Sequence, residues 1–339
     1  MLKLGVIGTN IITDQMLDAA RKTDQYVLTS VYSRSMKRAK EFGEQYDATE
    51  FFDDLEKFFE EGDFDVVYIA SPNSEHYRQA RMAIENDKFI IVEKPAFVNP
   101  GEFSAIESLL AAHPKARLVE AARHIHTPLY IAALKKADEM KKDYIQGGTF
   151  TVMKYSSRYD KVLDGDKPYP NIFTLKYAGG ALMDLGVYAV YAAVTMFGQP
   201  KTVVYYPTLA KTGVDAKGVA ILNYEKFTVT LNIGKTSNSY LYSEVYGLKD
   251  TLVLDSIFET KDVTYYDSEK RPHRLDVPVK SNSMIDEMSD FAKLFNDPDN
   301  EEQMMKYKGW LDLSRMVNAV MYSLRQSAQL EFPADKDQE

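Results

Sequence analysis

Short hydrophobic runs alternate with stretches of helical periodicity over the first 122 residues. This rhythm is typical of βαβ units and predicts an α/β domain over residues 1–122, built on a doubly wound parallel sheet. A short helix is expected at 53–59. The other predicted strands and helices are strands 3–7, 27–32, 66–70, 89–92 and 117–120 and helices 12–22, 35–46, 75–86 and 101–112.

From about residue 145 the pattern changes to longer strands with a period of two. Predicted strands lie at 148–156, 201–207, 217–224, 227–233, 240–247, 250–255 and 262–266, and predicted helices at 129–141, 181–197, 284–296 and 302–326. Such strands suit a large, mostly antiparallel sheet with helices on one face. Aromatic residues on its other face favour a partner. We expect an α+β domain over 123–330 that binds substrate and forms a homodimer or higher homo-oligomer, followed by a tail over 331–339.

Composition narrows the class of protein. A chain of 339 residues suits two domains with sizeable cores. The net charge of -9, with no basic stripe in the sequence, argues against nucleic acid. The sequence has no cysteine, which excludes disulfides and thiolate catalysis. Met1 runs directly into a strand pattern, which predicts no signal peptide and a cytoplasmic location.

The segment 178–198 is apolar and long enough to span a membrane. Asp184 lies inside it, and glycines interrupt its start. These features favour a buried helix in a soluble domain, so we expect no membrane partner.

The turn after the first predicted strand carries Gly8, Thr9, Asn10 and Ile11. Only Gly8 matches a glycine of the dinucleotide pattern G-x-G-x-x-G, because Asn10 and Thr13 occupy the other two glycine places. Asparagine enters left-handed backbone readily and can cap a helix, whereas threonine merely packs less closely. Backbone amides and the helix dipole can still hold a phosphate, although an ordinary strand-turn-helix also fits.

The second predicted strand ends in Ser33-Arg34 without a carboxylate. An NAD site usually has an acidic residue there for the ribose hydroxyls. A hydroxyl followed by a guanidinium instead suits a 2′-phosphate, and Arg34 can also stack on adenine. The pattern therefore favours NADP, with NAD as the second choice. A helix-capping Ser33 beside a solvated arginine is the plain alternative.

The tripeptide Glu93-Lys94-Pro95 follows the apolar run 89–92. A strand that ends this way brings an ammonium group to the carboxyl edge of the sheet, where open α/β folds bind ligands. A solvated charge before a turn is the alternative. The nucleotide-type turn upstream and an Asp-x-x-x-Tyr helix downstream favour a functional lysine.

With these motifs the sequence resembles the glucose-fructose oxidoreductase/inositol dehydrogenase/rhizopine-catabolism (Gfo/Idh/MocA) family, and within it the dihydrodiol dehydrogenase-like branch. The resemblance covers nearly the whole chain. It rests on the turn at Gly8, Ser33-Arg34, residues 70–76 (ASPNSEH), Glu93-Lys94-Pro95, residues 120–122 (EAA) and residues 179–188 (GGALMDLGVY). Asn10 departs from the family pattern, as does the segment 123–126 (RHIH), which bears on substrate choice.

The resemblance implies roles for particular residues. Those that would line the nicotinamide half of the cofactor site are Ser71, Pro72, Asn73 and His76, with Glu93 and Lys94 beside the ring. Asp184 and Tyr188 would face the nicotinamide from the second domain. Tyr188 stands where many members carry a catalytic histidine and the dihydrodiol branch carries tyrosine.

Asp184 and Tyr188 are four residues apart in a predicted helix, so both project from one face. Oxidation of a secondary alcohol needs a group that removes the hydroxyl proton, and we predict Tyr188 for it. A phenol has a reference pKa of about 10, which a neighbouring ammonium such as Lys94 lowers. Asp184 is expected to hold Lys94 or a substrate hydroxyl. A core tyrosine and a capping aspartate are the alternative.

The remaining candidates concern the substrate. Arg123, His126 and Tyr155 are weaker candidates for substrate contacts, and a surface or packing role fits them about as well. His124 and His126 have no third ligand at metal spacing, so we expect no metal.

Together the motifs predict an NAD(P)-dependent dehydrogenase or reductase that transfers hydride between nicotinamide and a secondary alcohol or carbonyl of a sugar, polyol or cyclic diol. Two other hypotheses keep the nucleotide. One is a redox-neutral glycoside hydrolase or lyase, and the other is a non-catalytic nucleotide-binding sensor.

Overall fold

The computed structural model describes residues 1–140 and 144–336. Contacts between Cα atoms divide this chain into two compact units, residues 1–122 with 280–314 and residues 123–279 with 315–339. The break after Ala122 falls at the expected boundary. Residues 280–314 return to the first unit, which differs from the continuous second domain expected over 123–330, because α9 (Met284–Asn296) packs against α1 (Ile11–Thr23).

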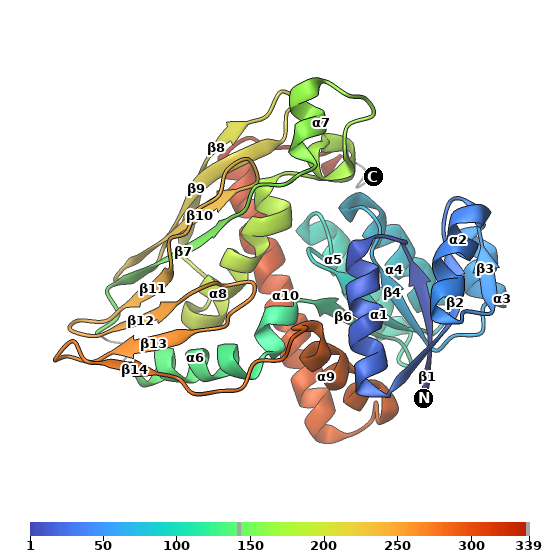
Figure 1. Ribbon diagram of the computed structural model, residues 1–339, viewed down its shortest axis with the longest axis horizontal. Coiled ribbons are helices and arrows are strands. Elements are labelled where there is room, and N and C mark those ends of the chain that lie inside the picture. Colours follow the sequence, from blue (N-terminus) through green and yellow to red (C-terminus); the bar gives the residue numbers. More distant parts are fainter. Residues whose placement is uncertain (141–143, 337–339) are drawn as a thin grey trace. The chain divides into compact units, whose positions relative to one another are not determined.

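The first unit is built on a parallel sheet. In the described part of the chain, six strands form it in the order β3-β2-β1-β4-β5-β6 (Figure 1). Their bounds are β1 Leu2–Ile7, β2 Tyr26–Tyr32, β3 Glu50–Phe52, β4 Val66–Ile69, β5 Phe89–Glu93 and β6 Arg117–Ala121. The strand order reverses between β1 and β4, the place where doubly wound sheets bind ligands. The expected α/β sheet is confirmed, with β3 as an added edge strand.

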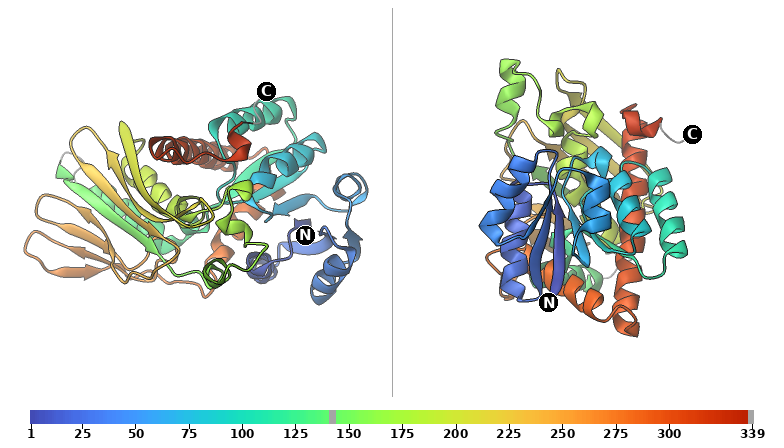
Figure 2. Two further views of the ribbon diagram at one scale, coloured as in Figure 1. Left: turned by 90° about the horizontal axis from the view of Figure 1, so that it is seen from above. Right: turned by 90° about the vertical axis from the view of Figure 1, so that its right-hand side faces the viewer.

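Helices cover both faces of this sheet (Figure 2, right). They are α1, α2 (Met36–Gly43), α3 (Leu55–Glu61), α4 (His76–Glu85), α5 (Pro100–Ala112) and α9. Two hydrophobic clusters pack around the strands, one containing Met288 and Phe291 of α9 and the other containing Phe103 of α5. Because both faces are buried, the strands read as continuous apolar runs rather than as alternating patterns.

The second unit is built on a mixed sheet. Its described strands run in the order β14-β13-β12-β11-β7-β10-β9-β8, and the β10–β7 pair is parallel while the other pairs are antiparallel. Their bounds are β7 Gly147–Met153, β8 Thr202–Leu209, β9 Asp215–Asn223, β10 Thr228–Gly234, β11 Ser243–Tyr246, β12 Thr251–Leu254, β13 Val263–Tyr266 and β14 Pro272–Arg274. The expected large, mostly antiparallel sheet is confirmed.

Helices α6 (Pro128–Glu139) and α8 (Val187–Phe197) lie on the same face of this sheet (Figure 1). The predicted helix 129–141 corresponds to α6. Its last predicted residue, 141, lies outside the described residues. A short helix α7 (Tyr159–Asp164) follows β7, which ends at Met153 and not at 156 as expected. Helix α10 (Glu301–Ser327) is shared between the units, and residues 333–335 of the expected tail form a 3-10 turn bound to buried Arg325.

The apolar segment Leu175–Phe197 is long enough to cross a membrane by composition alone. Within its most apolar window, 72% is buried inside the protein. That burial agrees with its interpretation as a core helix. Among the described residues, this is the segment that meets the length and hydropathy test.

Candidate active site

The turn after β1 lies against the end of β4. Gly8 has φ +105°, and a Cβ added there would lie 2.6 Å from the carbonyl oxygen of Ala70. Only glycine fits such an approach. The side chain of Asn10 donates to the same carbonyl at 2.8 Å, and its oxygen accepts from the backbone N–H of Ile12 at 3.0 Å. A close-packed glycine turn at the N-terminus of a helix, as here before α1, fits the pyrophosphate of a dinucleotide.

Two expectations about this turn need revision. Asn10 does cap α1, but with extended backbone (φ -115°), so the left-handed conformation is not used. Thr13 does more than pack, since its buried hydroxyl donates to the Gly8 carbonyl at 3.0 Å. The threonine therefore helps to close the turn. Thr9 lies within the turn, and Ile11 opens α1 with 67% of its surface exposed.

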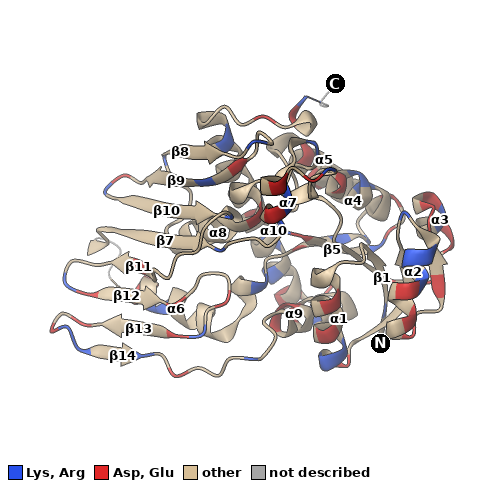
Figure 3. Ribbon diagram, turned by 45° about the horizontal axis from the view of Figure 1, so that its top comes forward, with Lys and Arg blue, Asp and Glu red and all other residues tan. Residues whose placement is uncertain are grey.

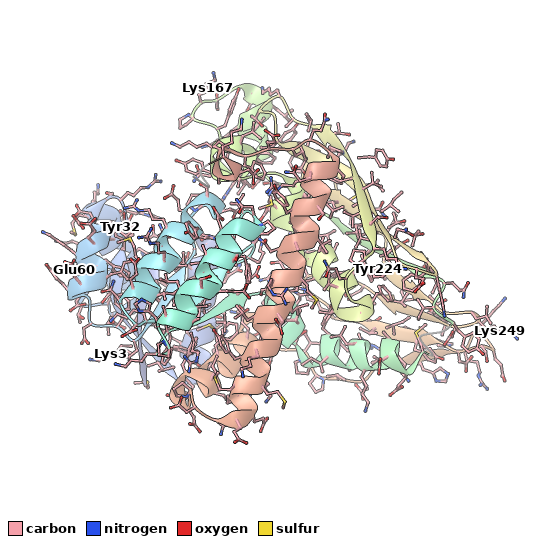
Figure 4. The ribbon with its side chains drawn as sticks, turned by 180° about the vertical axis from the view of Figure 1, so that it is seen from behind. Lys3, Tyr32, Glu60, Lys167, Tyr224 and Lys249 are labelled. Carbon is pink, nitrogen blue, oxygen red and sulfur yellow. The ribbon has the colours of Figure 1, made fainter. Side chains whose placement is uncertain are left out.

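An arginine that the sequence argument missed lies beside the turn. The guanidinium of Arg38 donates to the Thr9 carbonyl at 2.8 Å and to the Thr9 hydroxyl at 3.2 Å. Arg38 lies in the first turn of α2. Ser35, which follows Ser33-Arg34 in the sequence, caps that helix. Tyr32, labelled in Figure 4, ends β2, and burial raises the pKa of its phenol. The signal for Arg38 was its position three residues after the capping serine.

His76 connects the loops that follow β4 and β5. Its ring is 1% exposed, Nδ1 lies 3.1 Å from the Pro95 carbonyl oxygen, and Nε2 lies 3.0 Å from that of Ser71. Burial lowers the pKa of this imidazole, and the ammonium of Lys94 adds to the effect. These contacts let His76 fix two loops, and the direct contact with cofactor that the resemblance implies stays a prediction.

The neighbours of His76 are held by similar contacts. Ser71 donates to Gln79 at 2.7 Å, Pro72 precedes the 3-10 turn Asn73–Glu75, and Glu93 accepts from the Tyr68 hydroxyl at 2.6 Å. Lys94 follows β5 directly and is partly buried, and its bond to Pro95 is cis. The first unit thus gathers the expected cofactor residues, from Gly8 to Lys94, at the carboxyl edge of one sheet.

In the second unit, Asp184 lies in a π-helical turn. This turn, Leu182–Gly186, runs without a break into α8, so the predicted helix over 181–197 is confirmed, with π-helical hydrogen bonds at its start. Single π-turns occur frequently at functional sites. The Asp184 carboxylate accepts from the Nζ of Lys235, at the end of β10. The expectation that Asp184 binds Lys94 or a substrate hydroxyl did not include this lysine, because 51 residues separate the pair.

Tyr188 lies in the first turn of α8 among aromatic rings. Its ring centroid is 5.1 Å from that of His124 and 5.9 Å from that of Phe258. His124 is 1% exposed and also packs edge-to-face on Tyr130 and Tyr191. Tyr188 itself is 6% exposed. The aromatic contacts fix the direction of the phenol.

Two of the weaker substrate candidates, Arg123 and His126, share a 3-10 turn, and the third, Tyr155, follows β7. Arg123 pairs with Glu259 at 3.2 Å, and His126 is buried at 4% exposure. Tyr155 donates to Asp160 at 2.5 Å, a contact that raises the pKa of its phenol. Among residues 1–140 and 144–336, no group of three His, Asp or Glu side chains is arranged to hold a metal.

Comparison with known proteins follows the same division of the chain. The sequence model described as "Oxidoreductase family, NAD-binding Rossmann fold" (GFO/IDH/MocA) matches residues 2–121, and the GFO/IDH/MocA C-terminal domain matches residues 142–253. The uncharacterized oxidoreductase YgjR of Escherichia coli is 35% identical over 99% of both chains. The chain belongs to the Gfo/Idh/MocA family. It is an NAD(P)-dependent oxidoreductase of the dehydrogenase type.

Other relatives differ in how similar they are to this Gfo/Idh/MocA protein. The scyllo-inositol 2-dehydrogenase (NADP(+)) IolU of Bacillus subtilis is 33% identical over 99% of this chain and 100% of its own. The human trans-1,2-dihydrobenzene-1,2-diol dehydrogenase is 23% identical over 74% of each chain. The expectation that the chain is more similar to the dihydrodiol branch than to other branches is therefore wrong, because the inositol enzyme matches better and over the full length.

Solved structures show the same fold. A 3-ketoreductase from Actinomadura kijaniata, in complex with NADP and TDP-benzene, superposes with a TM-score of 0.81 at 19% identity, covering 96% of this chain and 97% of that one. A levoglucosan dehydrogenase superposes with a TM-score of 0.80 at 18% identity, covering 97% of each chain.

Proposed function

We propose that this oxidoreductase uses NADP(H) to interconvert a secondary alcohol and a ketone on a cyclic polyol or sugar. The observation that carries the cofactor choice is the end of β2. Ser33 and Arg34 follow that strand, and Arg38 is bound to the nucleotide turn through Thr9. Arg34 and Arg38 are four residues apart, and no carboxylate ends the strand. Two guanidinium groups in this region suit a 2′-phosphate. The NADP-dependent inositol enzyme at 33% identity supports the same choice.

The reacting groups proposed are Tyr188, Lys94 and Asp184. NADP(H), when bound, accepts or supplies the hydride. During oxidation Tyr188 takes the hydroxyl proton, and during reduction it returns a proton to the carbonyl oxygen. Lys94 favours the phenolate form of Tyr188 through its positive charge, and Asp184 accepts a hydrogen bond from a substrate hydroxyl.

The substrate class rests on the second unit and on the relatives. The Asp184 carboxylate keeps 32% of its surface exposed although it is paired. Carboxylates bind hydroxyl groups strongly because the hydrogen bond is charge-assisted. A ring that carries several hydroxyls offers one group for proton transfer to Tyr188 and others for binding. A cyclic polyol therefore fits better than a simple alcohol.

A panel of inositol stereoisomers, sugars and cyclic diols, each with NADP+ and NAD+, tests the proposal by nicotinamide absorbance. A net rise in NADPH with a ring polyol is expected. Consumption of a glycoside without any net change in absorbance would point to the redox-neutral alternative. Tight NADPH binding without turnover of any compound would point to a sensor.

We also propose that the protein is a cytoplasmic homo-oligomer. The sheet face opposite α6 and α8 carries exposed apolar side chains in the middle of its strands, such as Tyr206 (64%) and its cross-strand partner Val219 (39%). Charged residues gather mainly at the strand ends of this sheet (Figure 3). The molar mass from light scattering at micromolar concentration should be at least that of a dimer. A persistent monomer would contradict the proposed homo-oligomer.

A further inference from the structure

A buried lysine lies behind the candidate carboxylate Asp184. The Lys235 side chain is 2% exposed, whereas that of Asp184 is 32% exposed. The ammonium of Lys235 donates to Oδ2 of Asp184 and lies 5.4 Å from the ring centroid of Phe173. The pair is thus asymmetric, with the cation inside the protein and the anion near its surface.

A second buried carboxylate holds the turn that carries Asp184. Asp215, at the start of β9, is 2% exposed and accepts from the backbone N–H of Leu182 at 2.7 Å. The phenol of Tyr205 donates to the same oxygen at 2.7 Å. Gly180 has φ +124°, and a Cβ there would lie 2.0 Å from the other oxygen of Asp215. Asp215 therefore fixes the first residue of the π-helical turn.

Lys235 and Asp215 lie at adjacent ends of the paired strands β10 and β9. The backbone N–H of Lys235 donates to the carbonyl of Ala216, the neighbour of Asp215, at 2.9 Å. Burial raises the pKa of Asp215, while its hydrogen bonds and the charge of Lys235 act in the opposite direction. Among the described residues, the ionisable groups that face Lys235 include Asp184 from the π-turn and Asp215, with its partner Tyr205, from the sheet.

The desolvation of the Lys235 ammonium costs stability, which indicates that the lysine has a function other than packing. A buried ammonium loses its hydration, and a well-packed apolar side chain at the same place often gives equal or greater stability. A buried lysine that holds a partly exposed carboxylate does what an apolar residue cannot do, because it keeps the carboxylate ionised and oriented.

We propose that Lys235 is a positioning residue for the reaction: it holds the carboxylate of Asp184 in the orientation that binds a hydroxyl of the polyol, on a turn that Asp215 anchors. This inference rests on the proposed function. The residue acts through Asp184 and takes no part in proton or hydride transfer.

Steady-state kinetics of Lys235→Met, Lys235→Arg and Asp184→Asn test the proposal. Loss of the buried charge should raise KM for the polyol by about 10-fold to 100-fold, the usual effect of a misplaced binding group. NADPH affinity should stay within about twofold. Lys235→Arg should recover part of the loss. Lys201→Met, which breaks the exposed ion pair with Glu225, is the matched control and should leave KM unchanged.

The pH dependence separates positioning from a merely structural role. Without Lys235 the Asp184 carboxylate loses a favourable charge, so its pKa should rise. The acidic limb of kcat/KM should then move to higher pH in Lys235→Met. A folded Lys235→Met with unchanged KM and an unchanged acidic limb would overturn the proposal.

NMR titration and thermal unfolding test the pairing of Lys235 with Asp184 without any substrate. Their outcome therefore does not depend on the proposed function. The carboxyl carbon resonance of Asp184, assigned by its loss in Asp184→Asn, should titrate at higher pH in Lys235→Met than in the wild type. The double variant Asp184→Asn/Lys235→Met should melt at a higher temperature than Asp184→Asn, which leaves a buried ammonium without this carboxylate. An unchanged titration, or a double variant that melts lower, overturns the pairing even if no polyol is turned over.

Discussion

The first unit positions its functional groups mainly with backbone, whereas the second unit positions them with buried side chains. Gly8, Asn10 and His76 are fixed by carbonyl groups at the ends of β4 and β5 or in the turn itself. Asp184 is fixed by Lys235, and the turn that carries it by Asp215. The contacts of the first unit follow from the topology of a parallel sheet, while those of the second depend on pairs of charges remote in sequence.

This difference has consequences for substitution. A site built from backbone is damaged by changes in backbone conformation or by an added Cβ, and it tolerates many side-chain changes around it. A site built from buried charges is damaged by changes in charge, because each partner left alone stays desolvated. Substitutions in the two units should therefore differ in what they damage.

The largest effect is expected for Tyr188→Phe in the second unit. The substitution keeps the ring contacts with His124 and Phe258 but removes the proton. Turnover should fall on the order of 100-fold to 10,000-fold, the usual contribution of a general acid or base, while NADPH binding persists. Single-turnover kinetics with deuterated substrate would measure the chemical step.

Tyr191→Phe is the matched control, because Tyr191 packs on the same imidazole with its ring centroid 5.4 Å away. It should retain most of the wild-type turnover. Near-wild-type turnover of Tyr188→Phe, with a full isotope effect, would transfer the proton-transfer role to Lys94 or to a histidine. Under the proposed mechanism, Lys94→Met should depress turnover and shift the pH–rate profile, because the phenolate would lose the positive charge that favours it.

A smaller effect is expected for Gly8→Ala, which tests the backbone-built turn. A residue other than glycine at φ +105° costs roughly 1–3 kcal/mol, and the added methyl group meets the Ala70 carbonyl. The free energy of unfolding should fall by about that amount, and NADPH affinity should fall with it. Urea unfolding and fluorescence titration measure the two quantities.

Gly309→Ala serves as the control for this substitution. Gly309 lies inside helix α10 with no other atom within 4 Å of an added Cβ. The exchange should raise stability by about 0.4–1 kcal/mol, because alanine favours the helix and reduces the entropy of the unfolded chain. Equal losses at Gly8 and Gly309 would show that the turn has no special constraint.

Cofactor preference should change by a comparable amount in Arg34→Ala. A lost charged contact with a 2′-phosphate should weaken NADPH binding by about 1.5–3 kcal/mol, roughly 10-fold to 100-fold, and leave NADH binding almost unchanged. Arg38→Ala should act in the same direction and also loosen the turn at Thr9. Arg21→Ala, in an exposed ion pair with Asp47, is the control. Equal wild-type affinities for NADH and NADPH would falsify the choice of NADP.

The sequence was a good guide to the first unit because its motifs are local. The positions of Gly8, Ser71 and Lys94 follow from strands that end in a known order along a parallel sheet, so their clustering was predictable. The period of two also predicted the strands of the second unit. The predicted second-domain boundary missed the return of α9 to the first unit, since nothing local in its pattern records which sheet it covers.

The supports of Asp184 were not predictable in the same way. Lys235 ends an ordinary strand pattern and Asp215 begins another, and each resembles a solvated charge at a strand end. Only the pairing of β9 with β10 brings them to the π-turn. The sequence pattern predicts a helix over the π-turn but does not register the one inserted residue that changes its hydrogen bonds. The contact of Arg38 with Thr9 joins residues 29 positions apart, so no local pattern predicts it.

The smallest effect is expected for the pH dependence of stability through His76. Its folded pKa is lowered from 6.5, chiefly by burial, so its contribution to stability is fully present above that pH and is lost as the pH falls below it. The loss should reach about 1.4 kcal/mol per pH unit once the unfolded chain alone is protonated.

Two carbonyl neighbours oppose this trend, since a protonated ring could donate to both. We expect burial to dominate, because an enclosed imidazolium loses its hydration, and the ammonium of Lys94 adds a smaller effect in the same direction. Urea unfolding of the wild type and of His76→Asn between pH 8.5 and 5.5 measures the difference, which should be constant above about pH 7.5 and should shrink below 6.5. A difference that grows on acidification would mean that the two carbonyl groups outweigh burial, and that His76 holds the loops of the first unit as a cation.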